Sequence, residues 1–211
     1  MSAQMSIEAI QNLSFLALGD SYTIGEGVHL QNSFPYQMAD ILRNKNIHLN
    51  PPIMVAKTGW TTSELYTAIE SSNLNNEYDI VTLLIGVNNQ YRGKTIQEFT
   101  DEYEMLLQKA ISLAGNKRSH VLALSIPDWS VTPFADGRDK KKIADEINSF
   151  NTIVKSISCS SEVPFIDITT EYRARSVDPS FIAQDRLHPS GKEYQAWSVK
   201  IAEAIAIAYT K

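Results

Sequence analysis

Residues 15–27 read Phe-Leu-Ala-Leu-Gly-Asp-Ser-Tyr-Thr-Ile-Gly-Glu-Gly, an apolar segment that stops at three small or polar residues. The apolar run, which extends over residues 13–18, is typical of a buried strand. Gly19-Asp20-Ser21 is typical of a turn that presents a hydroxyl group at the end of such a strand. Because a hydroxyl is a poor nucleophile until a base removes its proton, catalysis by Ser21 requires a histidine and a carboxylate that orients the histidine.

The chain provides both groups near its C-terminus. Asp185 and His188 lie three residues apart, within Asp-Arg-Leu-His-Pro. A turn with this spacing can place the carboxylate against one imidazole nitrogen, which fixes the tautomer and the orientation of the ring. The other nitrogen is then free to take the hydroxyl proton. Because a histidine base must be neutral, we expect activity to rise through about pH 6 to 8.

Five apolar segments alternate with helix-like segments along the chain. They lack the polar alternation of a half-exposed sheet and are typical of strands covered on both faces. The expected strands are 13–18, 53–57, 80–85, 120–125 and 163–167. The expected helices are 34–44, 63–71, 96–113, 140–159 and 191–209. The sequence therefore predicts one α/β domain over residues 1–211, with a five-stranded parallel sheet in the middle of three layers.

Three small or polar residues follow the first three expected strands. Ser21 follows the first, Gly59 the second and Asn88 the third. The carboxyl ends of parallel strands meet at one edge of the sheet, and open α/β sheets bind ligands at that edge. We therefore expect the three residues to converge on one crevice.

Four short motifs occur in order along nearly the whole chain: Gly19-Asp20-Ser21, Lys57-Thr58-Gly59-Trp60, Gly86-Val87-Asn88-Asn89 and Asp185-x-x-His188-Pro189. Together they resemble the four sequence blocks of the GDSL, or SGNH, hydrolases. The resemblance implies a flavodoxin-like α/β/α fold with strand order 2-1-3-4-5, and a serine esterase that forms an acyl-enzyme. It implies a catalytic triad of Ser21, His188 and Asp185. It also implies that an oxyanion hole is formed by the backbone N–H groups of Ser21 and Gly59 and the side-chain amide of Asn88.

Each of these oxyanion-hole assignments has a chemical reason. A glycine at position 59 lets the backbone approach a substrate closely, and the Asn88 amide offers two donors that stay neutral. Two positions depart from the family pattern. Asn89 replaces the usual aspartate of the third block, and Tyr22 replaces the commoner leucine beside the serine. Tyr22 either packs beneath the loop or narrows the acyl site, and the sequence leaves both open.

Aromatic residues follow the expected strands and form a candidate substrate-binding rim: Trp60, Tyr91, Trp129 and Phe134. Such a rim suits an acyl chain or an aromatic leaving group, although each ring is as well explained by packing of the loops onto the domain. Three nearby arginines, Arg92, Arg138 and Arg186, are candidates for binding an anionic group of the substrate or are simply solvated.

The resemblance implies a small-molecule ester substrate but does not select it, since the family acts on short-chain and aryl esters, acyl thioesters, lysophospholipids and acetylated sugars. A compact single domain favours a small or lipid-like ester. Thioesterase, lysophospholipase and carbohydrate acetylesterase activities remain alternatives. A catalytically silent binding module is disfavoured by the intact Ser21, Asp185 and His188. A nucleotide-binding domain is disfavoured because residues 19–27 lack the glycine spacing and the Gly-Lys-Ser/Thr ending of phosphate loops.

The charge balance and the single cysteine exclude further classes. The 19 Lys and Arg and 24 Asp and Glu residues are interspersed and sum to −5. No basic surface of the kind that binds nucleic acid is expected. Cys159 alone excludes an intramolecular disulfide and a multi-cysteine metal site, and its helix-like context predicts a buried thiol. We expect no metal or cofactor, and activity that survives chelators.

The ends of the chain carry no obvious targeting or membrane-spanning segment. Residues 1–10 lack the basic region of a secretory signal, and the late apolar run 201–209 is too short to span a bilayer. We expect a cytoplasmic location, or an exported one if a leader has been removed. The oligomeric state is not predicted.

Overall fold

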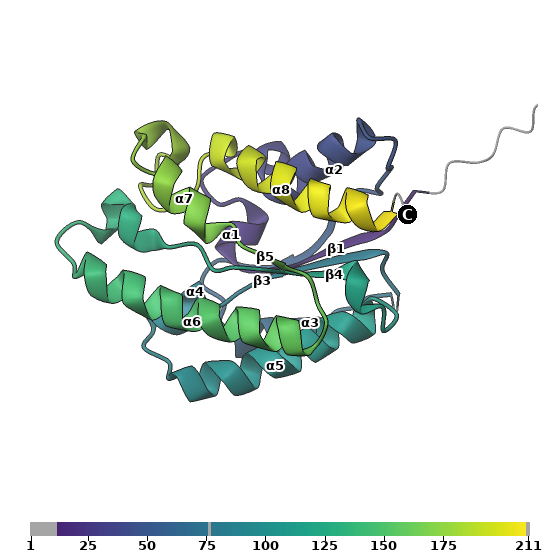
Figure 1. Cartoon of the computed structure of the whole chain (residues 1–211), viewed down its shortest axis with the longest axis horizontal. Helices are drawn as coiled ribbons and strands as arrows, with labels where there is room; N and C mark the ends of the chain where they lie inside the picture. Colours follow the sequence, from purple (N-terminus) through teal and green to yellow (C-terminus); the bar gives the residue numbers. More distant parts are fainter. Residues whose placement is uncertain (1–11, 76, 210–211) are drawn as a thin grey trace, which may run out of the picture.

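The computed structural model describes residues 12–75 and 77–209 and has a parallel sheet at its centre (Figure 1). The strands are β1 (Phe15–Gly19), β2 (Ile53–Ala56), β3 (Ile80–Leu84), β4 (Val121–Leu124) and β5 (Phe165–Ile166). Their order in the sheet is β2-β1-β3-β4-β5. The predicted α/β class and strand order are confirmed, and each predicted strand differs from the observed one by one or two residues at an end.

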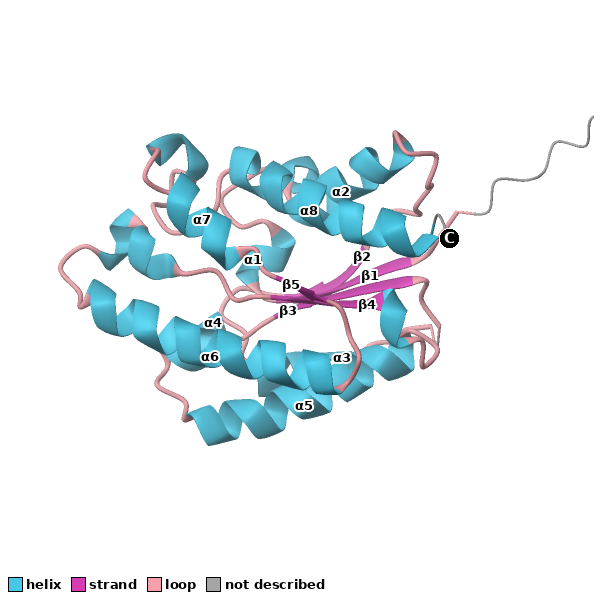
Figure 2. Ribbon diagram, in the orientation of Figure 1, coloured by secondary structure: helices cyan, strands magenta, loops and turns pink. Residues whose placement is uncertain are grey.

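Helices cover both faces of this sheet (Figure 2). One layer contains α2 (Phe34–Arg43), α7 (Thr169–Arg175) and α8 (Gly191–Tyr209), with α2 packed along α8. The other layer contains α3 (Thr62–Ser71), α5 (Ile96–Leu113) and α6 (Lys140–Ser160). Two short helices, α1 (Ser21–Ile24) and α4 (Val87–Tyr91), begin just after β1 and β3. The five long helices agree with the predicted ones within a residue at each end.

The start of α5 shows why such boundaries are set locally. The Thr95 hydroxyl accepts a hydrogen bond from the Glu98 N–H at 3.1 Å, and the Glu98 carboxylate accepts one from the Thr95 N–H at 2.9 Å. This reciprocal pair satisfies two backbone donors that a helix N-terminus otherwise leaves unpaired. The helix then buries one apolar face, formed by Phe99, Tyr103, Leu106, Ala110 and Leu113.

The core lies between the sheet and the two helical layers. Strands β1, β3 and β4 are buried along their whole lengths, as predicted for strands covered on both faces. The prediction is wrong for β2, where Ile53 is 44% exposed, because an edge strand has a neighbour on one side only. Cys159 is also exposed rather than buried, because the buried face of α6 at its last turn is formed by Val154 and Ser158.

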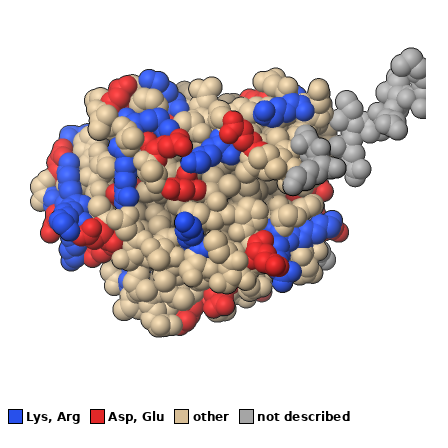
Figure 3. Space-filling view, in the orientation of Figure 1, with Lys and Arg blue, Asp and Glu red and all other residues tan. Residues whose placement is uncertain are grey.

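Charged side chains of both signs are interspersed over the face in Figure 3, as the composition indicates. Within the described residues, no helix is long and apolar enough to cross a membrane. The carboxyl ends of the strands lie at one edge of the sheet, and α1 and α4 begin at this edge.

Candidate active site

Ser21 is held at the end of β1 by a tight strand-to-helix turn. A Cβ atom added at Gly19 would lie 2.1 Å from the Thr23 hydroxyl, so only glycine fits where the strand passes under α1. Asp20 caps α1, with its carboxylate accepting a hydrogen bond from the Tyr22 N–H at 3.0 Å. Ser21 is the first residue of the helix and is 5% exposed. The turn therefore fixes the direction of its hydroxyl.

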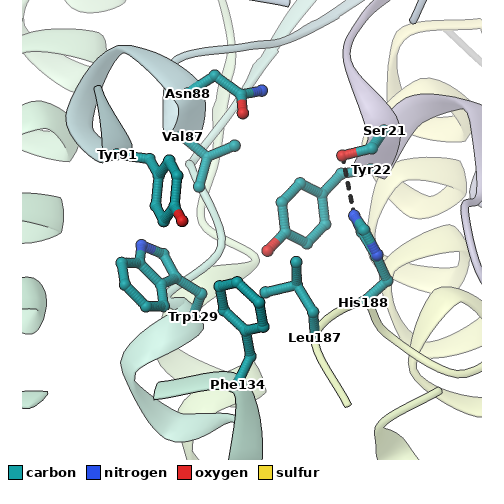
Figure 4. Close-up of a pocket in the computed structure, with 9 residues that line it drawn as sticks. All are labelled: Ser21, Tyr22, Val87, Asn88, Tyr91, Trp129, Phe134, Leu187 and His188. Atoms are coloured by element: carbon teal, nitrogen blue, oxygen red, sulfur yellow. Dashed lines mark hydrogen bonds between the residues drawn. The ribbon is translucent and has the colours of Figure 1, made fainter. Parts of the chain in front are cut away.

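The structure brings together the serine, histidine and aspartate that the sequence spacing singled out (Figure 4). His188 Nε2 lies 2.9 Å from Ser21 Oγ, and His188 Nδ1 lies 2.6 Å from Asp185 Oδ2. The other carboxylate oxygen of Asp185 accepts hydrogen bonds from the N–H groups of Leu187 and His188, both at 2.9 Å. Partial burial alone raises the pKa of Asp185, but these hydrogen bonds outweigh burial and hold the pKa below its ordinary value. The carboxylate is therefore ionised and fixed in place.

Gly27, to which the sequence analysis gave no role, lets the loop after α1 lie against the Asp185 carboxylate. Gly27 has φ +83°, and a Cβ atom there would lie 2.9 Å from Asp185 Oδ2 and 3.0 Å from Ala183 Cβ. The signal was present in the sequence as Gly-Glu-Gly shortly after the serine. The need for glycine at position 27 becomes evident only when the structure shows that the Asp185 segment lies against this loop.

Asn88 lies on α4, across the cavity from Ser21, and its amide nitrogen is on the side of the serine (Figure 4). This nitrogen donates one hydrogen bond to the Trp60 carbonyl at 3.0 Å. Since an amide NH₂ has two donors, the second is left for a ligand. Gly59 has φ +83°, a conformation that favours glycine, and its carbonyl accepts a hydrogen bond from Arg92. These contacts fix the backbone around residue 59 relative to Asn88.

Asn89, the departure from the family pattern, is fully buried and ties α4 to the start of α3. Its side-chain oxygen accepts a hydrogen bond from the Thr62 N–H at 3.0 Å. Its amide nitrogen donates to the Thr62 hydroxyl at 2.5 Å and to Glu102 Oε2 at 3.3 Å. Asn88 and Asn89 thus make two links from one helix to the segment that follows β2, and the links set the distance between Gly59 and Asn88.

A cavity of about 160 Å³ opens beside Ser21 and His188. Its other lining residues are Tyr22, Val87, Asn88, Tyr91, Trp129, Phe134 and Leu187 (Figure 4). Tyr91, Trp129 and Phe134 pack against one another, with ring centroids 5.6 to 6.4 Å apart, and form an aromatic wall. Trp129 is anchored by a hydrogen bond from its indole N–H to Gln90 at 2.8 Å.

One predicted substrate-binding residue is placed elsewhere. The Trp60 side chain packs against the hydrophobic core outside this cavity, as in the packing alternative, and the residue contributes its carbonyl to Asn88 instead. Tyr22 is 2% exposed, and its ring lies 5.1 Å from the His188 ring while also lining the cavity. Tyr22 therefore both packs beneath the loop and narrows the site. In the described residues, no cluster of three or more His, Cys, Asp or Glu side chains is arranged to hold a metal ion.

Comparisons with known proteins agree with this fold. The chain is 24% identical to the spore germination lipase LipC of Bacillus licheniformis, over 91% of this chain and 96% of the relative. The lipase Lip_vut3 from a goat rumen metagenome has a similar structure, with a TM-score of 0.74, 23% identity and coverage of 92% and 97% of the two chains. The acetyl xylan esterase AlAXEase has a TM-score of 0.72 at 19% identity, covering 92% of this chain and all of that one.

A direct match to a family model leads to the same family as the sequence blocks and the fold. The sequence model of the GDSL-like lipase/acylhydrolase family matches residues 17–196, which include the Ser21 turn and the Asp185–His188 segment. The chain belongs to the GDSL-like lipase/acylhydrolase family and is a carboxylic ester hydrolase.

Proposed function

We propose that this chain is a serine esterase that hydrolyses small carboxylic esters through an acyl-enzyme. The observation that carries the proposal is the continuous hydrogen-bond chain from Ser21 through His188 to Asp185, in which Ser21 and His188 also line a cavity. In this proposal Ser21 is the nucleophile, His188 the general base and Asp185 the group that orients the imidazole. A binding module of the same fold would have no need for this alignment.

The reaction proceeds in two steps of the same kind. Ser21 Oγ attacks the acyl carbon while His188 Nε2 takes the hydroxyl proton, and the negative charge moves to the former carbonyl oxygen. The N–H groups of Ser21 and Gly59 and the free amide hydrogen of Asn88 stabilise this oxyanion. His188 returns the proton to the departing alkoxide, which leaves as the alcohol. Water then attacks the acyl-serine with the same base, releasing the acid and restoring Ser21.

The size of the cavity favours a short acyl chain or a single aromatic ring. Its volume of about 160 Å³ is close to that of a protein cavity, about 150 Å³, that holds one benzene molecule. A long chain must continue past Tyr91 and Phe134, which are 48% and 37% exposed at the mouth. The names of the similar proteins include both an acetyl xylan esterase and lipases, so the lipid alternative is kept as the second candidate.

Hydrolysis of p-nitrophenyl esters from acetate to palmitate tests the proposal. We expect the wild type to prefer short chains, and Ser21→Ala to lose several orders of magnitude in kcat while remaining folded. Ser149→Ala, which changes an exposed serine on α6, is the matched control and should keep full activity. The highest activity on the palmitate ester would favour the second candidate, a lipase-like activity on long-chain esters. Failure of the wild type to cleave any member, together with failure of Ser21 to react with a fluorophosphonate, would contradict the esterase proposal.

A further inference from the structure

Arg138, in the loop before α6, lies over the aromatic wall of the cavity. Its guanidinium carbon is 4.8 Å from the centroid of the Phe134 ring, 5.4 Å from that of Trp129 and 5.5 Å from that of Tyr91. All three distances fall within the range of cation–π attraction. Three rings that also line the catalytic cavity therefore hold one cation in place, although its side chain is exposed.

The charges around Arg138 leave its guanidinium without an acidic partner in the described part of the chain. Asp136, two residues before Arg138, is already shared by Lys140 at 2.9 Å and Arg186 at 3.3 Å. Asp139 caps α6 and accepts a hydrogen bond from the Lys142 N–H at 2.9 Å. In Figure 3, blue and red side chains gather at the side of the molecule where Figure 1 shows the loop that leads into α6. This corner of the molecule thus holds a cation whose donors are available to a ligand.

The other two arginines singled out by the sequence are occupied. Arg92 donates to the Gly59 carbonyl and pairs with Glu64 at 3.2 Å, so it supports the backbone around residue 59. Arg186 pairs with Asp136 at 3.3 Å. Of the three, Arg138 alone combines contact with the cavity wall and the lack of an acid partner among the described residues.

We propose that Arg138 forms an anion subsite at the aromatic wall, and that the preferred substrates are esters carrying a carboxylate near the scissile bond. The inference rests on the proposed esterase function and narrows its substrate class. The planar guanidinium matches the two oxygens of a carboxylate, and stacking on the rings reduces the freedom that it must lose on binding. One unpaired positive charge balances one carboxylate charge, whereas a phosphate dianion carries more. Since the chain as a whole has a net charge of −5, attraction of an anion must come from such a local cation.

Two pairs of esters that differ by one charge test the subsite. The first pair is p-nitrophenyl hydrogen glutarate, whose carboxylate lies on the acyl side, and its neutral counterpart p-nitrophenyl methyl glutarate. The second pair is 4-butyryloxybenzoate, whose carboxylate lies on the leaving group, and its neutral methyl ester. The measured quantity is the ratio of kcat/KM for the charged and neutral members, at low salt and at 0.5 M NaCl, where screening weakens exposed charges.

We expect the wild type to favour the charged member of at least one pair by about fivefold, the upper range for an exposed ion pair. Arg138→Gln should reduce that ratio to about one, Arg138→Lys should retain part of it, and added salt should lower it. Arg118→Gln, which removes an exposed arginine ahead of β4, is the matched control and should keep both the ratio and the activity.

The inference is overturned if the wild type shows no preference in either pair. It is also overturned if Arg138→Gln slows both members alike, which is the signature of a merely structural role. Hydrolysis of the neutral esters by the wild type reports on the esterase function independently. Failure of the subsite is therefore distinguishable from failure of the active site.

Discussion

Asp20, beside the nucleophile, is a buried carboxyl group whose titration affects stability. It is 1% exposed, and burial raises its pKa from the ordinary 3.8 to about 7 although the Tyr22 N–H donates to it. Replacement by asparagine removes the charge but keeps an oxygen that accepts the same hydrogen bond, so the cap of α1 is retained. We predict that Asp20→Asn stabilises the protein at alkaline pH and has little effect at acid pH.

The direction and size of the effect follow from proton linkage. Between pH 3.8 and about 7 the folded protein binds more protons at Asp20 than the unfolded chain, so the free energy of unfolding falls as pH rises. The contribution of the protonated group is fully present below the unfolded pKa and is lost as pH rises through the folded pKa. A difference of about 3 pH units at about 1.4 kcal/mol each corresponds to about 4 kcal/mol. Asp20→Asn does not suffer this loss.

Urea unfolding at pH 5 and pH 8.5 measures the effect. The free energy of unfolding of Asp20→Asn minus that of the wild type should be larger at pH 8.5 than at pH 5 by about 2 kcal/mol or more. Asp101→Asn, which changes an exposed aspartate on α5, corrects for general effects of charge removal. An equal stability difference at the two pH values would refute the reasoning, because Asp20 would then not titrate in the folded protein over this range.

The remaining predictions concern catalysis. Asn88→Ala should lower kcat by about 10² to 10³, measured on a short p-nitrophenyl ester, because one oxyanion donor is lost; a loss confined to KM would contradict that role. Gly27→Ala should reduce kcat more than 10-fold by displacing Asp185, since the new Cβ would lie 2.9 Å from its carboxylate oxygen; unchanged kinetics would show that the loop yields instead. Asn89→Asp should lower kcat increasingly as pH rises, because it places a second carboxylate about 3.3 Å from that of Glu102. Adding Glu102→Gln to Asn89→Asp should restore activity, and failure of that rescue would mean that charge repulsion is not the cause.

The sequence predicted the long elements well because they repeat a pattern over many residues. Helix α5 shows an apolar face over five turns, and its observed ends coincide with the predicted ones. The helices α1 and α4 have four and five residues, too few for a period to be recognised, yet they carry Ser21 and Asn88. The site was therefore found through motif spacing rather than through local structure.

The error at Trp60 arises because the direction of a side chain in a loop depends on tertiary packing. Trp60 and Trp129 both follow strands, but only Trp129 finds a partner, Gln90, that holds its ring at the cavity. Cys159 follows the buried Ser158 by one position, and a rotation of about 100° per residue carries it off the buried face of α6. Composition does not distinguish the two tryptophans, whereas the helical period of the buried residues of α6 does place Cys159 off the buried face.

The network around Asn89 explains how this chain differs from the family at its third block without losing the arrangement of the site. Thr62 N–H requires an acceptor, which the oxygen of either asparagine or aspartate provides. The opposite side of residue 89 faces the carboxylate of Glu102, which is itself an acceptor, so a donor is needed there and only asparagine provides one. The negative charge of the cluster thus lies on α5 at Glu102 rather than on α4 at residue 89. Because the Asn89 side chain is hydrogen-bonded on both sides, to Thr62 and to Glu102, the link between α4 and the segment that follows β2 is kept without a charge at residue 89.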